Sequence, residues 1–235
     1  GLDLGTSAGK ALLIGAEQEV LAEARAPLGV ARPHPGWSEQ TPADWLKATD
    51  DVMSALASQA DLSAIKAIGL SGHMHGATLI DKSGDVLRPC ILWNDTRAHI
   101  EAAAMDADPK FREVSGNIVF PGFTAPKLAW VKENEPAVFA KTAKVLLPKD
   151  YLRLWLTGDA VSEMSDAAGT SWLDVGARDW SDDLLARTGL TRDHMPNLVE
   201  GAAAAGGLRS ALAAKWGRTA GIPVAGGGGD KAATA

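Results

Sequence analysis

The sequence has a single cysteine, Cys90, and this scarcity excludes a disulfide framework and a cysteine-based metal site. One cysteine fits a reducing compartment, so we expect a cytoplasmic protein. No apolar run approaches the roughly 20 residues that a membrane-spanning helix needs. Lysine and arginine form no basic run that could neutralise a phosphate backbone. Neither a membrane nor a nucleic acid is therefore an expected partner.

The composition that is present, 46% hydrophobic and 22% charged over 235 residues, predicts a soluble globular protein with one large domain or two small ones. The chain opens without methionine on a pattern typical of the second half of a strand, residues 1–4. It stops on what looks like the start of a helix, residues 231–235. We therefore expect this chain to be part of a longer protein.

Three short apolar runs at the start of the chain are separated by glycine-rich and polar turns, which predicts three antiparallel strands. The runs cover residues 1–4, 10–14 and 19–24. The first turn contains Gly5, Thr6 and Ser7, and Asp3 precedes it. Backbone amides in such a turn can bind a phosphate, and Asp3 can hold Mg²⁺ directly or through water. An ordinary hairpin with an aspartate at its edge is the alternative.

Four consecutive glycines, residues 226–229, follow a strand predicted at residues 222–225 and lead directly to Asp230. Because glycine has no Cβ and tolerates positive φ, the amides of Gly228 and Gly229 can approach a ligand closely. Asp230 is delivered to the same place and is the first candidate for a catalytic carboxylate. A flexible connector whose aspartate begins a helix is the alternative.

A histidine-rich turn follows the strand predicted at residues 65–70 and contains His73, Met74 and His75. Open α/β sheets usually bind ligands at the carboxyl ends of their strands. Neutral imidazole can donate to or accept from a sugar hydroxyl group, and Met74 can provide an apolar wall. One alternative is a metal site at the two histidines, although no third ligand lies nearby in the sequence. The other is a turn that satisfies the histidines itself.

The strand predicted at residues 89–93 ends in Trp93, Asn94 and Asp95. An aromatic plate beside amide and carboxylate groups is typical of carbohydrate binding, because sugars stack their C–H faces and need both donors and acceptors. Asn94 or Asp95 can instead cap the helix predicted at residues 98–106.

Local patterns in the second half of the chain give three smaller predictions. Residues 165–170 and residues 201–207 are expected to be loops, because both stretches consist of small residues. Thr124 is expected to cap a helix that has Pro126 in its first turn.

Residues 122–134 resemble the signature of the FGGY carbohydrate kinases position by position, with Thr124, Lys127 and Trp130 in register. The pair Glu133 and Asn134 completes the fit. Because a fit over thirteen residues is highly specific, the chain is identified as resembling this family over essentially its whole length.

Other segments carry the same resemblance. Residues 1–7 resemble the first phosphate motif of the actin, hexokinase and heat-shock ATPase fold, and residues 226–230 resemble the segment with the family's catalytic aspartate. Within the family, residues 74–76, 93–95 and 165–170 are similar to the xylulokinase branch.

The resemblance implies a ribonuclease H-like α/β fold of the actin, hexokinase and heat-shock ATPase type. Its mixed sheet should have three antiparallel strands first and helices on both faces. Residues 1–235 would form the amino-terminal, sugar-binding domain of such a kinase. The carboxyl-terminal half that binds most of the nucleotide would be absent from this chain, which alone should be inactive.

The resemblance also implies roles for single residues. Asp230 would be the general base, and Asp3 would lie beside the phosphates and Mg²⁺ of ATP. Met74 and His75 would contact a ketose, with Trp93 and Asp95 as further candidates for the sugar pocket. The phosphate-binding candidates are Gly5, Thr6, Ser7, Gly228 and Gly229.

The implied reaction is the ATP-dependent phosphorylation of a ketopentose, with D-xylulose first and another pentulose or a polyol as alternatives. The expected partners are a sugar and ATP, with a homodimer as a candidate assembly. Lys231 departs from the family, whose members often have an amide there, and this leaves the sugar preference open. Two other readings are an actin-like or chaperone-like ATPase without a sugar substrate and a non-catalytic sugar-binding module.

Overall fold

The first part of the central sheet follows from alternating burial along three strands. In the computed structural model, which describes residues 1–217 and 220–233, β1 (Leu2–Leu4), β2 (Ala8–Ile14) and β3 (Val20–Pro27) pair antiparallel. Leu2 and Leu4 are buried on one face, and Asp3 between them faces the other way, as the period of two in a strand requires. The three antiparallel strands predicted from the sequence are confirmed.

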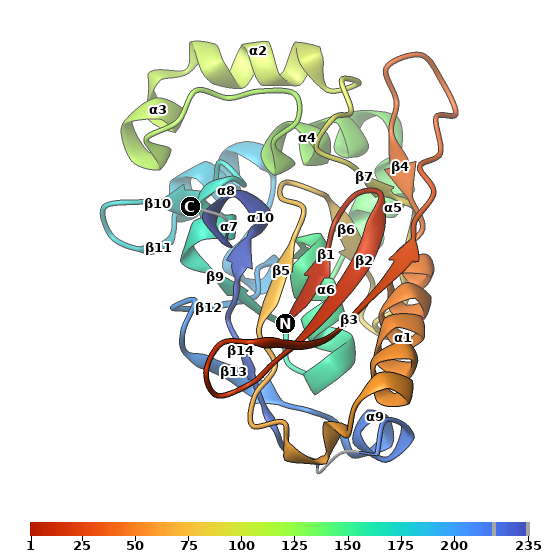
Figure 1. Ribbon diagram of the computed structural model, residues 1–235. Helices are drawn as coiled ribbons and strands as arrows, with labels where there is room; N and C mark the ends of the chain where they lie inside the picture. Colours follow the sequence, from red (N-terminus) through yellow and green to blue (C-terminus); the bar gives the residue numbers. More distant parts are fainter. Residues whose placement is uncertain (218–219, 234–235) are drawn as a thin grey trace.

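Two further strands extend this sheet in the parallel sense, giving the order β15-β5-β1-β2-β3. β5 (Leu70–Gly72) pairs with β1, and β15 (Gly228–Gly229) pairs with β5 (Figure 1). Because parallel strands run in one direction, β1, β5 and β15 end at the same edge of the sheet.

The strand predicted at residues 65–70 is wrong in its bounds, since β5 begins only at Leu70. Asp61 accepts a hydrogen bond from the Ser63 amide and caps a short 3-10 helix, η1 (Leu62–Ala64). Ile68 then forms an isolated bridge with Val224. The backbone of this segment is therefore paired elsewhere before it reaches β1.

Two helices cover one face of the sheet. α1 (Pro42–Gln59) and α6 (Pro148–Thr157) pack there, and their buried side chains, among them Trp45 and Leu152, join those of the strands in one hydrophobic core. On the opposite face, side chains such as Asp3, Lys10 and Ser71 line a cleft. The sheet therefore separates a core from a space large enough for a ligand.

A second hydrophobic core forms around α4 (Thr124–Asn134), whose Leu128 and Val131 are fully buried. Elements that contribute to it include α2 (His99–Ala107), α3 (Pro109–Ser115), α8 (Asp182–Thr188), β6 (Thr78–Ile80) and β8 (Lys144–Leu146). Figure 1 shows α2, α3 and α4 together above the turn that joins β1 and β2. This places α4 near the edge of the sheet at which the parallel strands end.

The two predicted loops of small residues are wrong in part, because only residues 169–170 and 201–203 of them are turns or bends. Residues 164–168 form α7 (Met164–Ala168), because the Glu163 carboxylate caps it by accepting from the amides of Ser165 and Asp166. Residues 204–207 form β13 (Ala204–Gly207), which pairs antiparallel with β14 (Pro223–Ala225). A capping glutamate and a distant pairing partner decided these segments, and neither is visible in a local composition.

The remaining elements are short. They are β4 (Glu39–Gln40), β7 (Cys90–Ile91), α5 (Pro136–Lys141), β9 (Val161–Glu163), β10 (Leu173–Asp174), β11 (Asp179–Trp180), η2 (Arg192–His194), β12 (Asn197–Val199), α9 (Ser210–Lys215) and α10 (Asp230–Ala233). The predicted helix start at residues 231–235 corresponds to α10 as far as Ala233, and residues 234–235 lie outside the described part. Within residues 1–217 and 220–233, no helix combines the length and the apolar character needed to cross a membrane.

Candidate active site

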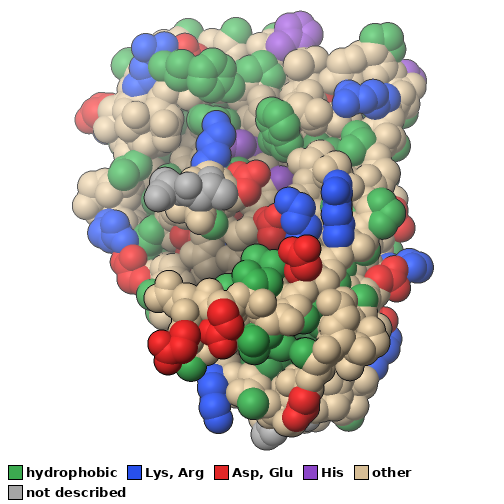
Figure 2. Space-filling model, in the orientation of Figure 1, with side chains coloured by type: hydrophobic (Ala, Val, Ile, Leu, Met, Phe, Trp, Pro, Cys, Tyr) green, Lys and Arg blue, Asp and Glu red, His purple; other side chains and the backbone are tan. Residues whose placement is uncertain are grey.

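The two candidate carboxylates, Asp3 and Asp230, come together at the parallel edge of the sheet. Asp3 on β1 pairs with Ser71 on β5, and Ser71 pairs with Gly228 on β15. Asp230 directly follows Gly229, which is the last paired residue of β15. Both aspartates line one cleft of about 1630 Å³. Figure 2 shows this face of the molecule hollowed near its middle, with acidic and basic side chains along the border.

Asp3 is held by two polar neighbours. Its Oδ1 accepts a hydrogen bond of 2.6 Å from the Ser71 hydroxyl, and its Oδ2 lies 3.7 Å from Nζ of Lys10. Lys10 was missed in the sequence, although the hairpin register, which places it opposite Asp3, could have revealed it. Among the described residues, no group of three or more His, Cys, Asp or Glu side chains could hold a metal ion. This single carboxylate fits a Mg²⁺ ion whose other ligands are phosphate and water oxygens.

The turn after β1 is held by a hydrogen bond of its own backbone and by two side chains from other elements. The Gly5 amide donates to the Ala8 carbonyl at 3.0 Å and closes the turn. Trp93 donates its indole N–H to the Thr6 hydroxyl at 3.0 Å, and Gln40 donates to the Thr6 carbonyl at 2.7 Å. Gly5 lines the cleft, whereas Thr6 and Ser7 are not part of its lining. Phosphate binding by Thr6 and Ser7 stays a prediction.

The glycine loop needs its glycines for close packing. Gly227 has φ of 75°, and a Cβ added there would lie 2.1 Å from the Leu70 carbonyl oxygen. A Cβ on Gly229 would lie 2.7 Å from Sδ of Met74, so Met74 packs directly on β15. Gly228 lines the cleft, and a Cβ added there would make only ordinary contacts, the nearest at 3.7 Å from the Ala233 amide nitrogen. The loop therefore brings the predicted sugar contact Met74 beside the strand that ends at Asp230.

His75 is held as a neutral imidazole. Its Nδ1 lies 2.8 Å from the Gly169 carbonyl oxygen, and its ring stacks on Phe123 with 4.7 Å between centroids. Burial lowers the pKa of His75 to about 4, against the opposing effect of the Gly169 contact. Because a carbonyl oxygen only accepts, Nδ1 carries the proton and Nε2 is an acceptor. Such a nitrogen can accept a hydrogen bond from a sugar hydroxyl group.

His73 belongs to the core. It is fully buried, packs edge-on against Trp45 with 5.4 Å between centroids, and burial lowers its pKa to about 3. Neither ring nitrogen has a hydrogen-bond partner among the described residues. His73 is therefore a core residue, unlike His75, which the sequence suggested as a sugar contact.

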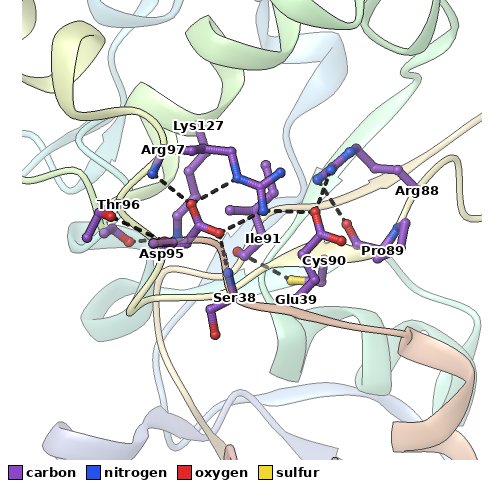
Figure 3. Close-up of polar contacts among 12 residues, drawn as sticks. Ser38, Glu39, Arg88, Pro89, Cys90, Ile91, Asp95, Thr96, Arg97 and Lys127 are labelled. Carbon is purple, nitrogen blue, oxygen red and sulfur yellow. Dashed lines mark hydrogen bonds and ion pairs between the residues drawn. The ribbon is translucent and has the colours of Figure 1, made fainter. Parts of the chain in front are cut away.

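Asp95 lies in a buried cluster of ion pairs, which Figure 3 shows beside Lys127. Arg97 donates to both of its oxygens, at 2.9 and 2.7 Å, and the Ser38 amide donates at 2.6 Å. Arg97 also pairs with Glu39 at 2.8 Å, and its guanidinium lies 3.6 Å from the ring centroid of Trp37. These contacts give Asp95 a structural role, and a sugar contact by Asp95 stays a prediction.

Trp93 differs from Asp95 in exposure. Its side chain is 49% exposed, and its carbonyl oxygen approaches Gly122 so closely that a Cβ there would lie 2.2 Å away. Trp93 is therefore an exposed ring on a fixed backbone, which leaves its face open to a ligand.

The mixed sheet β15-β5-β1-β2-β3, with antiparallel strands at one side and parallel strands at the other, is consistent with the ribonuclease H-like fold of the actin and hexokinase type. Solved structures show this fold. A xyloylose kinase from Brucella ovis aligns with a TM-score of 0.97 and 64% identity, over 99% of this chain and 48% of that chain. Xylulose kinase from Rhodospirillum rubrum aligns with a TM-score of 0.94 and 31% identity, over 98% and 49%. The predicted fold class is confirmed.

The model of the FGGY family of carbohydrate kinases, N-terminal domain, matches residues 1–235. The chain belongs to this family. Xylulose kinase of Escherichia coli (strain K12) is 53% identical over 236 residues, which cover 100% of this chain and 49% of that protein. The chain thus spans about half the length of the curated relatives that it matches.

Proposed function

We propose that the protein to which this chain contributes phosphorylates a ketopentose with ATP, and that D-xylulose is the first substrate to test. The observation that carries the proposal is the convergence of Asp3 and Asp230 on one cleft, with Met74 packed against the strand that delivers Asp230. The names of the curated relatives, xylulose kinases at 53% and 41% identity, support the same substrate.

Phosphoryl transfer asks little covalent chemistry of a protein and depends on positioning and charge. ATP with Mg²⁺ supplies the phosphoryl group when it is bound. Asp230 accepts the proton of the sugar's terminal hydroxyl group as general base. Asp3 would hold the Mg²⁺ of ATP through water, and Lys10 would add positive charge beside it. Gly5 and Gly228, which line the cleft, would bind the phosphates, and phosphate binding by Gly229, whose amide lies 3.4 Å from Oγ of Ser165, stays a prediction.

The sugar is held on the other side of Asp230. Met74 provides an apolar wall, Nε2 of His75 accepts from a hydroxyl group, and the exposed face of Trp93 stacks on the sugar. Closure of the second half of the protein over the cleft would exclude water and limit the hydrolysis of ATP. The cytoplasmic location and the homodimer stay predictions from the sequence.

An ADP-release assay on the full-length protein tests this proposal. We expect turnover with D-xylulose above that with other ketoses and glycerol, and almost none without sugar. Turnover that does not depend on sugar would instead identify an actin-like or chaperone-like ATPase. Sugar binding without turnover would identify a binding module.

The role of Asp230 has its own test. Asp230→Ala should abolish phosphorylation while it leaves sugar affinity within about tenfold, because a general base contributes mainly in the transition state. Asp44→Ala removes an exposed carboxylate from α1 and serves as the matched control. Full turnover of the Asp230 variant would reject the assignment.

A further inference from the structure

The main-chain carbonyl of His75 accepts hydrogen bonds from two side chains of α4. Thr124 donates its hydroxyl to this oxygen at 3.2 Å, and Lys127 donates its ammonium to it at 2.8 Å. Both side chains belong to fully buried residues. They lie three positions apart and therefore on one face of the helix.

Lys127 is an unusual residue for such a place. Among the described residues its ammonium forms no ion pair with a carboxylate, and its second hydrogen bond, of 2.7 Å, goes to the Gly122 carbonyl. Burying an ammonium in this way is costly, and an apolar side chain would fill the space without that cost. Burial lowers the pKa of Lys127 to about 7, and Arg97 reinforces this effect while Asp95 opposes it. We therefore look for the role of Lys127 in its hydrogen bond to the His75 carbonyl.

His75 is the residue that benefits. Its φ of 66° lies in the left-handed region, which residues with a side chain rarely adopt and which surrounding contacts must hold. Its ring is held separately, because Gly169 has no Cβ: an added one would lie 2.4 Å from Cε1 of the imidazole. The carbonyl and the imidazole are therefore fixed from two different elements.

We infer that Thr124 and Lys127 are positioning residues for His75. Their hydrogen bonds to its carbonyl hold its backbone in the left-handed conformation. This conformation keeps Nδ1–H on the Gly169 carbonyl, so that Nε2 is available as an acceptor for a sugar hydroxyl group. This inference rests on the proposed sugar kinase function and deepens it. It assigns two residues of the thirteen-residue signature to the sugar side of the site.

The kinetic test uses Thr124→Val and Lys127→Met in the full-length protein. Both should raise the KM for D-xylulose roughly tenfold or more, since a lost charge-assisted or buried hydrogen bond has an effect of this size, while the KM for ATP stays within about twofold. Thr124→Ser should restore the sugar KM. The matched controls are Thr41→Val, whose hydroxyl makes no capping hydrogen bond, and Lys132→Met, which is exposed on the same helix.

A spectroscopic test separates this inference from the proposed function. In protein labelled with ¹⁵N-histidine and free of sugar, we expect the His75 ring, assigned with His75→Gln among the five histidines of the chain, as the Nδ1–H tautomer. Both variants should move it toward a mixture of tautomers. If wild-type protein phosphorylates no sugar while this change is seen, the proposed function fails and the positioning role stands.

Two results would overturn the inference. One is an unchanged His75 signal together with an unchanged sugar KM in Thr124→Val. The other is a parallel rise of both KM values with a fall in thermal stability, which is what a purely structural role predicts. If Lys127→Met does not fold, Thr124→Val, which keeps the shape of the side chain, decides alone.

Discussion

Two fully buried lysines, Lys127 and Lys149, support the two sides of the candidate site in opposite electrostatic surroundings. Nζ of Lys127 meets two carbonyl oxygens, and burial lowers its pKa to about 7. Nζ of Lys149 lies 2.8 Å from Asp150, 3.4 Å from Asp166 and 3.7 Å from Glu163. Although burial opposes it, the three carboxylates raise the pKa of Lys149. Equal burial thus gives opposite shifts, and the neighbouring charges decide the sign.

The difference also separates the tasks of the two lysines. Lys127 holds the backbone at His75 on the sugar side. Lys149 belongs to a buried ionic cluster, composed of Lys149, Asp150, Arg153, Glu163 and Asp166. This cluster reaches the glycine loop, because Arg153 donates to the Gly226 carbonyl and Glu163 accepts from Ser165, whose Oγ faces the Gly229 amide. Lys127, on the sugar side, can lose its proton near neutral pH, whereas Lys149, on the side of Asp230, stays protonated.

The largest expected effect comes from removing Lys149. Lys149→Met should lower the free energy of unfolding of the full-length protein by about 3–5 kcal/mol, because it removes the cation of a buried acidic cluster in which only Asp150 keeps an arginine partner. Lys127→Met should cost only about 1–3 kcal/mol, since two carbonyls lose a donor but no charge is stranded. Urea denaturation at pH 7 measures both. Lys47→Met, which breaks an exposed pair with Asp51, is the control and should change nothing measurable. Equal losses in the two buried variants would contradict the comparison.

The pH dependence of stability should change when Asp166 is replaced. Burial, reinforced by Asp150 and Glu163, raises the pKa of Asp166 to about 8, although Lys149 lowers it. Between the unfolded pKa of about 4 and that value the folded state binds more protons, so its stability falls as the pH rises. Asp166→Asn should remove up to about 1.4 kcal/mol of this fall per pH unit. Denaturation between pH 5 and pH 8, with the exposed Asp44→Asn as control, measures the slope; identical slopes would contradict the shift.

Lys127 should give a slope of the opposite sign over a narrower range. With the pKa lowered from about 10.4 to about 7, the unfolded state binds more protons above pH 7 and stability rises with pH. Lys127→Met should remove up to about 1.4 kcal/mol of this rise per pH unit between pH 7 and pH 9. Burial raises the pKa of the neighbouring Cys90 thiol to about 11, so Cys90 stays protonated in this range. A variant with the wild-type slope would show that Lys127 keeps its charge.

The sequence allowed the scaffold and the two carboxylates to be predicted because their signals are local. Short apolar runs and turn residues predicted the first three strands, and the glycines predicted the approach to Asp230. What stayed hidden depends on distant partners. Thr124, for example, was expected to cap α4, but it is the first residue of that helix, after Phe123 as N-cap. Its hydroxyl instead donates to His75, 49 residues away.

The same limit applies to the partners of the candidate carboxylates. Ser71 reaches Asp3 across 68 positions of the chain, and no local pattern joins them. Lys10 could have been found, because a hairpin register follows from turn length. Asp95 shows the same limit from the other side: its place after a strand predicts a sugar contact, which stays a prediction, but its engagement by Arg97 was not foreseen. Residue type predicts which interactions a side chain can make, and only the fold determines which partner it meets.

The smallest expected effect concerns the link between the buried ionic cluster and Gly229. The Gly229 amide lies 3.4 Å from Oγ of Ser165, and this hydroxyl donates to Glu163 at 2.9 Å. Ser165→Ala removes the link next to Asp230 without stranding a charge, so kcat should fall only roughly two- to tenfold while the KM for sugar stays within about twofold. Ser58→Ala, on an exposed turn of α1, is the matched control for steady-state kinetics. An unchanged kcat would show that Ser165 serves α7 alone, and the two lysines would then differ in charge but not in their connection to the base.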